Sequence, residues 1–283
     1  METVSRPEDA RYWVLACQDR KERVGLVPTM GALHEGHLSL VRAARNDCER
    51  VVVSIFVNPA QFSPGEDLET YPRPRQRDLE LCEREGVDLV FEPLRGDMYL
   101  PGHSTYVHVE GLSAGLEGAH RPNFFRGVAT VVLKLFHILP ADVAYFGRKD
   151  AQQLAVVRRM VQDLFVPIEI KACPTVREPD GLAMSSRNAY LSPEERAAAP
   201  ALYQALMAGR RAFLSGARDP AAVTEAARRR LAEEERFLLQ YLECVDAETF
   251  QPAVAPLSGR ELLATAAFLG STRLIDNIQL QEG

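Results

Sequence analysis

Short apolar runs alternate with longer amphipathic stretches along the first part of the chain. Residues 51–57 form an apolar run rich in β-branched side chains, which is typical of a strand buried on both faces. Residues 37–48 instead repeat their apolar side chains at helical spacing. With a further apolar run at 24–27, these segments predict a strand–helix–strand unit.

The same alternation continues as far as about residue 176. It predicts helices and strands in turn, with helices at 76–85, 127–139 and 151–164 and strands at 87–91, 143–146 and 168–171. Strands that alternate with helices are typical of a parallel sheet covered on both faces. We therefore predict an α/β fold, with a Rossmann-like doubly wound parallel sheet forming a catalytic domain at 1–176.

The pattern changes in the last third of the chain. Ser192-Pro-Glu-Glu195 is typical of a helix start, with Ser at the cap and Glu three residues on. Helices are predicted at 193–215 and 220–240, and short strands at 241–245, 262–269 and 272–275. These elements predict a smaller C-terminal α+β domain at 177–283.

Composition narrows the range of partners and compartments. The formal net charge is −6, so we expect no general affinity for nucleic acid or for anionic membranes. No apolar run reaches the ~18 residues of a membrane span, and the N-terminus lacks the apolar core of a signal peptide. The five cysteines include no Cys-x-x-Cys pair, which favours a reducing cytoplasm over a disulfide framework.

The first candidate site is Pro28-Thr-Met-Gly-Ala-Leu-His34-Glu-Gly-His37, where a predicted strand leads into a predicted helix. Ligands of parallel sheets bind beyond the carboxyl ends of strands, and a helix N-terminus there suits phosphate. His34 and His37 are three residues apart, so they share one face of the first helical turn. Their imidazoles can donate hydrogen bonds to phosphate oxygens whose charge grows as pyrophosphate leaves. Two alternatives remain open: the histidines cap the helix, or they bind a metal. His-Glu-Gly-His is one residue short of a zinc-protease motif.

Two further segments follow predicted strands. Ser54-Ile-Phe-Val-Asn58-Pro-Ala-Gln61-Phe62 supplies Gln61, whose amide can both donate to and accept from a substrate with hydroxyl and carboxylate groups. Phe146-Gly-Arg-Lys149-Asp-Ala-Gln-Gln153 supplies Lys149, which could neutralise phosphate. Taken alone, either segment could be an ordinary turn.

The fourth candidate is the loop Val176-Arg-Glu-Pro-Asp-Gly-Leu-Ala-Met184-Ser-Ser-Arg187-Asn, between the two predicted domains. Two hydroxyls and a guanidinium suit a triphosphate, which arginine can hold in bidentate fashion. A loop of this kind could close over a ligand and exclude water. The alternative is an ordinary polar linker.

These motifs together carry a resemblance to a known family. The His-x-Gly-His element and the Met-Ser-Ser-Arg loop resemble the paired elements of the nucleotidyltransferase superfamily. Over nearly the whole chain, the sequence is similar to the pantothenate synthetase (pantoate–β-alanine ligase) family. The matching segments are Pro28–His37, Phe56–Phe62, Phe125–Val132, Phe146–Asp150 and Leu182–Asn188.

The resemblance implies a two-step reaction. Pantoate attacks ATP to give pantoyl adenylate and pyrophosphate, and β-alanine then displaces AMP to give pantothenate. It also implies Mg2+ as the partner of the triphosphate and a homodimeric assembly. Because an acyl adenylate reacts with water, a C-terminal lid over the site has a physical purpose.

The resemblance further implies roles for individual residues. His37 is the expected proton donor, His34 its phosphate-binding neighbour and Lys149 a third catalytic residue. Gln61 is expected to bind pantoate and β-alanine, Gln153 pantoate, and Asn58 substrate, and no side chain is expected to be a metal ligand. The expected ATP contacts are Met30, Gly31, Ala32, Leu33, His34, Glu35, Gly36, His37, Gly147, Arg148, Lys149, Asp150, Val176, Met184, Ser185, Ser186 and Arg187.

Three positions depart from the family pattern. Arg148 stands where an acidic or amide residue is more usual, Asn123-Phe124 replaces Gly-His, and His137 replaces Asn. We expect these changes to affect at most the rim of the ATP site. A plain nucleotidyltransferase and a non-catalytic nucleotide-binding regulator remain as alternatives, whereas a tRNA-charging enzyme is disfavoured because the chain is small and acidic.

Overall fold

The computed structural model describes residues 1–281. Within them the chain divides into two compact units. The first contains residues 1–114, 118–148 and 152–174, and the second contains residues 115–117, 149–151 and the chain from 175 onward. The change at residue 175 lies next to the predicted boundary at 176/177, but two short internal segments also group with the second unit.

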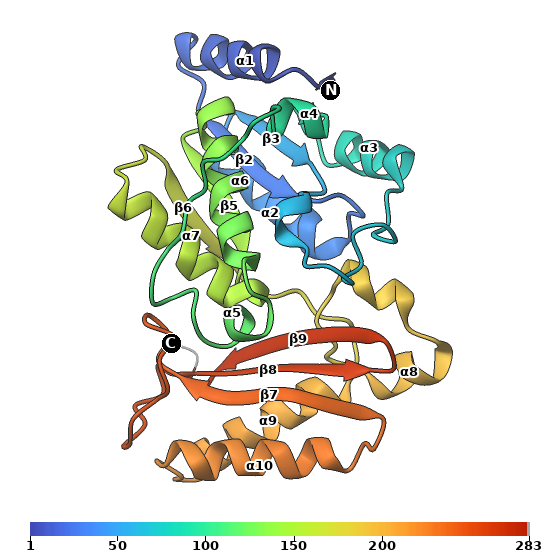
Figure 1. Cartoon of the computed structure of the whole chain (residues 1–283), viewed down its shortest axis with the longest axis vertical. Helices are drawn as coiled ribbons and strands as arrows, with labels where there is room; N and C mark the ends of the chain where they lie inside the picture. The colour runs from blue at the N-terminus through green and yellow to red at the C-terminus, as the bar shows by residue number, and fades with distance from the viewer. Residues whose placement is uncertain (282–283) are drawn as a thin grey trace. The chain divides into compact units, whose positions relative to one another are not determined.

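The first unit is built on a parallel sheet, labelled in part in Figure 1. Within residues 1–281 it has six strands in the order β1-β4-β3-β2-β5-β6. They are β1 (Glu2–Val4), β2 (Val24–Thr29), β3 (Arg50–Ile55), β4 (Leu89–Phe91), β5 (Val143–Gly147) and β6 (Glu169–Cys173). The sheet and its flanking helices confirm the α/β prediction.

Helices of the first unit bury both faces of this sheet. They are α1 (Pro7–Asp19), α2 (Glu35–Asp47), α3 (Arg75–Arg84), α4 (Arg95–Met98), α5 (Glu117–His120), α6 (Phe124–Ile138) and α7 (Ala151–Asp163). The first residues of α5 and α7 group with the second unit. Val41 and Ala44 of α2 pack with Val27 and Val53 in one core. Leu26, which alternates to the other side of β2, is also completely buried.

Several elements were absent from the sequence prediction. Strand β1 has only three residues and is largely exposed, so it carries little periodicity. Helix α1 buries only Ala10, Val14 and Cys17, which is a narrow apolar stripe. Helix α4 spans a single turn. Each of these elements forms through tertiary contacts more than through local sequence pattern.

The strand order determines where a ligand can bind. The chain runs outward from β2 to β3 and β4 and then returns to place β5 on the other side of β2. This reversal is a topological switch point, and ligands of doubly wound sheets bind beyond the carboxyl ends of the strands there. The segments that follow Thr29 and Gly147 therefore flank the expected binding crevice.

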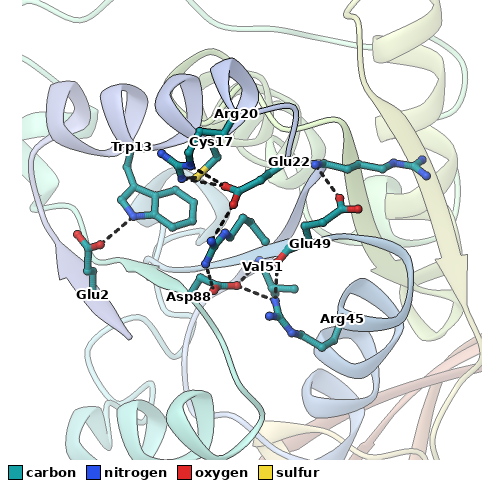
Figure 2. A network of polar contacts seen from close by, with 11 residues as sticks. Glu2, Trp13, Cys17, Arg20, Glu22, Arg45, Glu49, Val51 and Asp88 are labelled. Atoms are coloured by element: carbon teal, nitrogen blue, oxygen red, sulfur yellow. Dashed lines mark hydrogen bonds and ion pairs between the residues drawn. The ribbon is translucent and has the colours of Figure 1, made fainter.

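Charged side chains occupy the opposite, amino edge of the sheet (Figure 2). Asp88 accepts hydrogen bonds from the Val51 N–H at 2.9 Å and from Arg45 and Arg50 at 2.6 and 3.0 Å. Arg50 also donates to Glu22 at 2.8 Å. The guanidinium groups of Arg50 and Arg20 lower the pKa of Glu22 to about 2. This network joins the starts of β3 and β4 and lies at the end of the sheet opposite the carboxyl ends of the strands.

The second unit combines an antiparallel sheet with helices. Within the described residues its sheet has the order β7-β8-β9. The elements are α8 (Pro193–Ala198), α9 (Ala201–Leu214), α10 (Pro220–Ala232), β7 (Phe237–Val245), β8 (Leu262–Leu269) and β9 (Thr272–Gln279). Leu206 of α9 and Val223 of α10 pack with Leu242 and Leu263 of the sheet. The predicted α+β class of this region is confirmed.

Two predicted helices in this unit have wrong bounds. The helix expected at 193–215 is divided, because Pro200 has no N–H to continue the hydrogen-bond ladder. The helix expected at 220–240 ends at Ala232, since the apolar run from Phe237 pairs with β8 as a strand. The capping box at Ser192 is confirmed, with the Glu195 N–H donating to the serine hydroxyl at 3.2 Å.

Among the helices of residues 1–281, none has both the length and the apolar character that crossing a membrane requires.

Candidate active site

The two histidines of the first motif form the start of α2. His34 is the N-cap residue, and its Nδ1 atom accepts a hydrogen bond from the Gly36 N–H at 3.1 Å. His37 Nδ1 accepts in turn from the His34 N–H at 3.4 Å, and the ring centroids are 4.1 Å apart. The capping interpretation is therefore correct, and the expected phosphate contact of the two histidines stays a prediction. In a neutral imidazole whose Nδ1 accepts a hydrogen bond, the proton is on Nε2, so Nε2–H is the donor that such a ring can offer.

The turn that leads from β2 to this helix has an unusual backbone. Gly31 has φ +80° and Ala32 has φ +51°, both in the left-handed region. Alanine rarely adopts this conformation, so surrounding contacts must hold it. Thr29 contributes by accepting from the Gly31 N–H at 3.1 Å and donating to the Ser54 carbonyl at 2.7 Å.

Asp78, on α3, hydrogen-bonds to this turn, and sequence reasoning missed it. Its Oδ2 atom accepts from the Ala32 N–H and its Oδ1 atom from the Leu33 N–H, both at 2.8 Å. The side chain is buried, and burial raises the pKa of its carboxyl against the opposing effect of the two N–H donors. The sequence carries one signal of this burial. Asp78 lies four residues before the buried Cys82, so both side chains lie on the inward face of α3.

Glu35 is the first residue of α2, and its ion-pair partner lies further along the same helix. Its carboxylate forms an ion pair with Arg42, further along α2, and Arg42 also binds Glu85 at 2.5 Å. Met30 and Gly36 are half-buried. The expected ATP-contact segment 30–37 is thus a structured turn and helix start.

The segment after β3 orients the Gln61 amide. Asn58 Nδ2 donates to the Gly127 carbonyl at 3.1 Å and to Gln61 Oε1 at 2.9 Å. Asn58 Oδ1 accepts from the Tyr99 hydroxyl at 2.7 Å. Because Gln61 Oε1 accepts from Asn58, the Nε2 donors of Gln61 are the part of the amide suited to a substrate carboxylate or hydroxyl. Asn58 is itself buried and makes these three hydrogen bonds within the protein, and its expected contact with substrate stays a prediction.

The segment after β5 is a short turn that leads into α7. Gly147 ends the strand, and Arg148 is exposed. Lys149 and Asp150 group with the second unit, where the Lys149 carbonyl accepts from Asn277 of β9 at 2.7 Å. The Lys149 ammonium lies 3.6 Å from the Asp150 carboxylate. Gln153 is half-buried near the start of α7.

The fourth motif forms a hairpin in the second unit. The Met184 N–H donates to the Val176 carbonyl at 3.0 Å, and Arg177 pairs with Ala183 in an antiparallel bridge. Ser185 then caps the 3-10 helix η3 (Ser186–Tyr190) by accepting from the Arg187 N–H at 3.3 Å. The hairpin therefore places Val176 beside the start of the Met184–Arg187 segment, which brings two separate parts of the expected ATP contacts together.

In the first unit, the structure brings the predicted residues to one edge of the sheet. His34 and His37 follow β2, Gln61 follows β3 and Gly147 ends β5, and β2 pairs with both of these neighbours. Sequence reasoning missed Asp78, Tyr99 and Asn277, which hold predicted site residues through hydrogen bonds. Their positions depend on tertiary contacts between elements far apart in the chain.

One departure from the family pattern has a direct explanation. Asn123 has φ +72° at the start of α6, a conformation that glycine adopts freely and asparagine tolerates better than most residues. At another departure, His137, the main-chain carbonyl accepts a hydrogen bond from Arg11. This contact does not depend on the His137 side chain. Nothing in the structure explains the arginine at position 148.

Comparisons with known proteins agree on one family. A family model described as Pantoate-beta-alanine ligase matches residues 2–279. The pantothenate synthetase of Thermotoga neapolitana is 51% identical over 277 residues, which cover 98% of this chain and 99% of that protein. The pantothenate synthetase of Moorella thermoacetica is 50% identical over 281 residues, 99% of each chain.

Solved structures give the same result. A pantothenate synthetase of Thermus thermophilus has a TM-score of 0.95 and 47% identity, with 100% of both chains covered. The pantoate-beta-alanine ligase of Francisella tularensis, solved in complex with beta-gamma ATP and beta-alanine, has a TM-score of 0.82 and 31% identity. That alignment covers 100% of this chain and 99% of the Francisella chain.

Proposed function

This chain belongs to the pantoate-beta-alanine ligase family, and we propose how its residues carry out the reaction of that family. The chain is an enzyme that uses ATP to condense pantoate with β-alanine, giving pantothenate. The observation that carries this assignment is the family match over residues 2–279. The site at the carboxyl ends of β2, β3 and β5 supplies the chemistry that the reaction needs.

The proposed route has two displacements. A carboxylate oxygen of pantoate attacks the α-phosphorus of ATP, the bond from that phosphorus to the bridging oxygen breaks, and pyrophosphate leaves. The amine of β-alanine then attacks the acyl carbon of pantoyl adenylate, and the bond from that carbon to the AMP oxygen breaks. The amine nitrogen loses a proton, and pantothenate and AMP are released.

The histidine pair serves the first displacement. Negative charge grows on the pyrophosphate as it leaves, and a preorganised donor stabilises this charge most at the transition state. The Nδ1 atoms of His34 and His37 accept hydrogen bonds, so Nε2–H is the donor that each neutral ring can offer. We assign proton donation to His37 and phosphate binding to His34, and we assign charge neutralisation to Lys149.

The remaining contacts orient the substrates. Gln61, held through its Oε1 atom by Asn58, is assigned to pantoate and β-alanine. Gln153 is assigned to pantoate. For ATP we assign the segments 30–37 and 147–150, Val176, and Met184 to Arg187. Alignment of the two reacting groups accounts for a large part of the rate in reactions of this kind.

We also propose that Mg2+ enters with ATP. Within residues 1–281 there is no group of three or more His, Cys, Asp or Glu side chains that could hold a metal ion. Phosphate oxygens and water, which Mg2+ readily keeps as ligands, would therefore hold it. When bound, the ion would neutralise charge on the leaving pyrophosphate.

Two properties of the whole molecule complete the proposal. We assign a homodimer by family membership, and light scattering of the purified chain would measure it. We assign the cytoplasm as the compartment, since all five cysteines are free and buried in the structure, which a reducing environment preserves.

A single assay with omissions tests the function. Purified protein is incubated with ATP, Mg2+, pantoate and β-alanine, and AMP and pantothenate are measured, with each component omitted in turn. Release of AMP should require both pantoate and β-alanine. Pantoate alone should support exchange of labelled pyrophosphate into ATP, whereas AMP release without β-alanine would contradict the two-step route.

A further inference from the structure

We propose that Asp78 is a positioning residue for adenylation, which fixes the turn between β2 and the histidine pair in its ATP-binding conformation. This inference rests on the proposed function of that turn. Asp78 is not assigned a contact with any of the reacting atoms. Its effect passes through the main chain of Ala32 and Leu33, immediately before His34.

The hydrogen bonds of Asp78 match the turn in number and direction. The two carboxylate oxygens accept from two successive main-chain N–H groups, each at 2.8 Å. Successive N–H groups that converge in this way form an anion-binding concavity, and here the anion is a side chain of the protein. With only 1% of the residue exposed, water does not compete for these donors.

The turn depends on such an anchor because its conformation is unfavourable by itself. Ala32 has φ +51°, which an alanine seldom adopts without external support. The space around the anchor is also filled: a Cβ atom on Gly31 would lie 3.0 Å from Asp78 Oδ2 and 3.0 Å from Ile55 Cγ2. Asp78 and Ile55 thus confine the turn from α3 and from β3.

The anchor also limits which donors remain for ATP. The N–H groups of Ala32 and Leu33 are hydrogen-bonded to a buried carboxylate that carries negative charge when ionised. A phosphate is not expected to replace that carboxylate, so ATP contacts from this segment must come from other atoms, including the imidazole donors of His34 and His37. Asp78 therefore directs the triphosphate toward the start of α2, where the helix dipole favours it.

The first experiment replaces Asp78→Asn, which keeps the shape but leaves one oxygen to accept and places an amide N–H2 against a main-chain donor. We expect the KM for ATP in pantoate-dependent pyrophosphate exchange to rise by about tenfold or more, since hydrogen bonds to a charged group are lost. The KM for β-alanine in the complete reaction should change less than twofold. An ATP KM within twofold of wild type in Asp78→Asn would overturn the proposal.

Asp88→Asn is the matched control. Asp88 is also a carboxylate that accepts a main-chain N–H, from Val51, but it lies at the amino edge of the sheet (Figure 2). This variant should keep the wild-type KM for ATP even if its melting temperature falls. An equal rise in the ATP KM of both variants would show a general loss of structure and would overturn a specific role for Asp78.

A second substitution, Ala32→Gly, tests whether Asp78 acts through the backbone conformation of the turn. In the double variant Asp78→Asn with Ala32→Gly, glycine adopts the left-handed conformation without steric strain, so part of the lost ATP affinity should return. The same Ala32→Gly change in the wild-type background should not improve the ATP KM. No rescue in the double variant would contradict action through the turn.

A measurement on the unchanged protein covers the case in which Asp78→Asn does not fold. Amide hydrogen exchange without ATP should show protection of the Ala32 and Leu33 amides, and rapid exchange at both would overturn the proposal. If instead wild type makes no pantothenate while these amides are protected, the proposed function fails and the anchor itself stands.

Discussion

The Nδ2 atom of Asn277 donates a hydrogen bond to the main-chain carbonyl of Lys149, with a nitrogen–oxygen distance of 2.7 Å. Asn277 is on β9, and Lys149 belongs to the short segment 149–151 that groups with the second unit. The bond fixes the backbone of a residue assigned to charge neutralisation. It therefore links a proposed catalytic side chain to a strand residue 128 positions away along the chain.

Asn277→Ala removes this support. We expect kcat/KM for ATP to fall by about fivefold, which is the usual effect of one lost hydrogen bond of about 1 kcal/mol. Gln279→Ala, two residues along the same strand, removes an amide whose contact to the Arg260 carbonyl is long at 3.5 Å, and should have little effect. Equal activities of Asn277→Ala and wild type would exclude the positioning of Lys149 through this bond.

His37→Ala tests the assigned proton donor. Removing one preorganised donor to developing charge lowers kcat by about 10²–10³ in comparable sites. Pyrophosphate exchange dependent on pantoate should show this loss, because it reports the first displacement alone. His108→Ala, at an exposed position, serves as the control. Undiminished exchange in His37→Ala would remove His37 from the mechanism.

Tyr99→Phe tests the orientation of Gln61. The Tyr99 hydroxyl donates to Asn58 Oδ1 at 2.7 Å, and burial raises the pKa of Tyr99 to about 12, so it remains a donor at neutral pH. Phenylalanine keeps the ring and removes only that donor. The KM for pantoate should rise about fivefold. The KM for ATP should not change, and a parallel rise in it would show that the effect is not confined to Gln61.

The fold could be predicted well where one period dominates the sequence. Strands β2, β3 and β5 and the helices that follow them have continuous apolar runs or clear stripes. The prediction was wrong at 233–240, because the run from Phe237 is a strand through its pairing with β8 and not through a local preference. The break at Pro200 had a local signal, since proline interrupts the helical ladder.

Only those residues of the candidate site that lie in sequence motifs could be predicted. Segments that follow parallel strands can be assigned to one edge from sequence alone, and His37 and Gln61 do follow neighbouring strands. Asp78 could not be assigned to the turn at Ala32, because 46 residues separate them and one helical carboxylate does not specify its partner. Supporting residues of this kind are determined by tertiary packing, which carries no sequence motif.

The Glu22 network predicts a pH effect on stability. Hydrogen bonds from Arg50 and Arg20 lower the pKa of Glu22 to about 2 from the ordinary 4.5. The folded carboxylate therefore releases its proton at a lower pH than the unfolded one. Its contribution to stability is fully present above pH 4.5 and is lost as the pH falls toward about 2.

Glu22→Gln should accordingly flatten the pH dependence of the unfolding free energy in that window. Denaturant unfolding of both proteins at several pH values measures the difference, and Glu8→Gln, on the exposed surface of α1, is the control. Because Glu22 lies in the amino-edge network, kcat at neutral pH should not change. Parallel curves for Glu22→Gln and wild type would contradict the assigned role.

Gly127→Ala should displace Gln61 by steric contact. A Cβ atom on Gly127 would lie 2.1 Å from the Ala60 carbonyl oxygen and 2.8 Å from the Gln61 nitrogen. Both are backbone atoms of the 3-10 helix η1 (Pro59–Gln61), so either that helix or α6 must move. Overpacking of this kind costs about 1–3 kcal/mol, and we expect a lower melting temperature together with a kcat/KM for pantoate reduced by about tenfold.

Gly96→Ala is the control, since a Cβ atom there would meet nothing within 4 Å. Loss of stability in Gly127→Ala with a wild-type KM for pantoate would contradict this prediction. The contact between α6 and η1 would then support the fold without positioning the Gln61 amide.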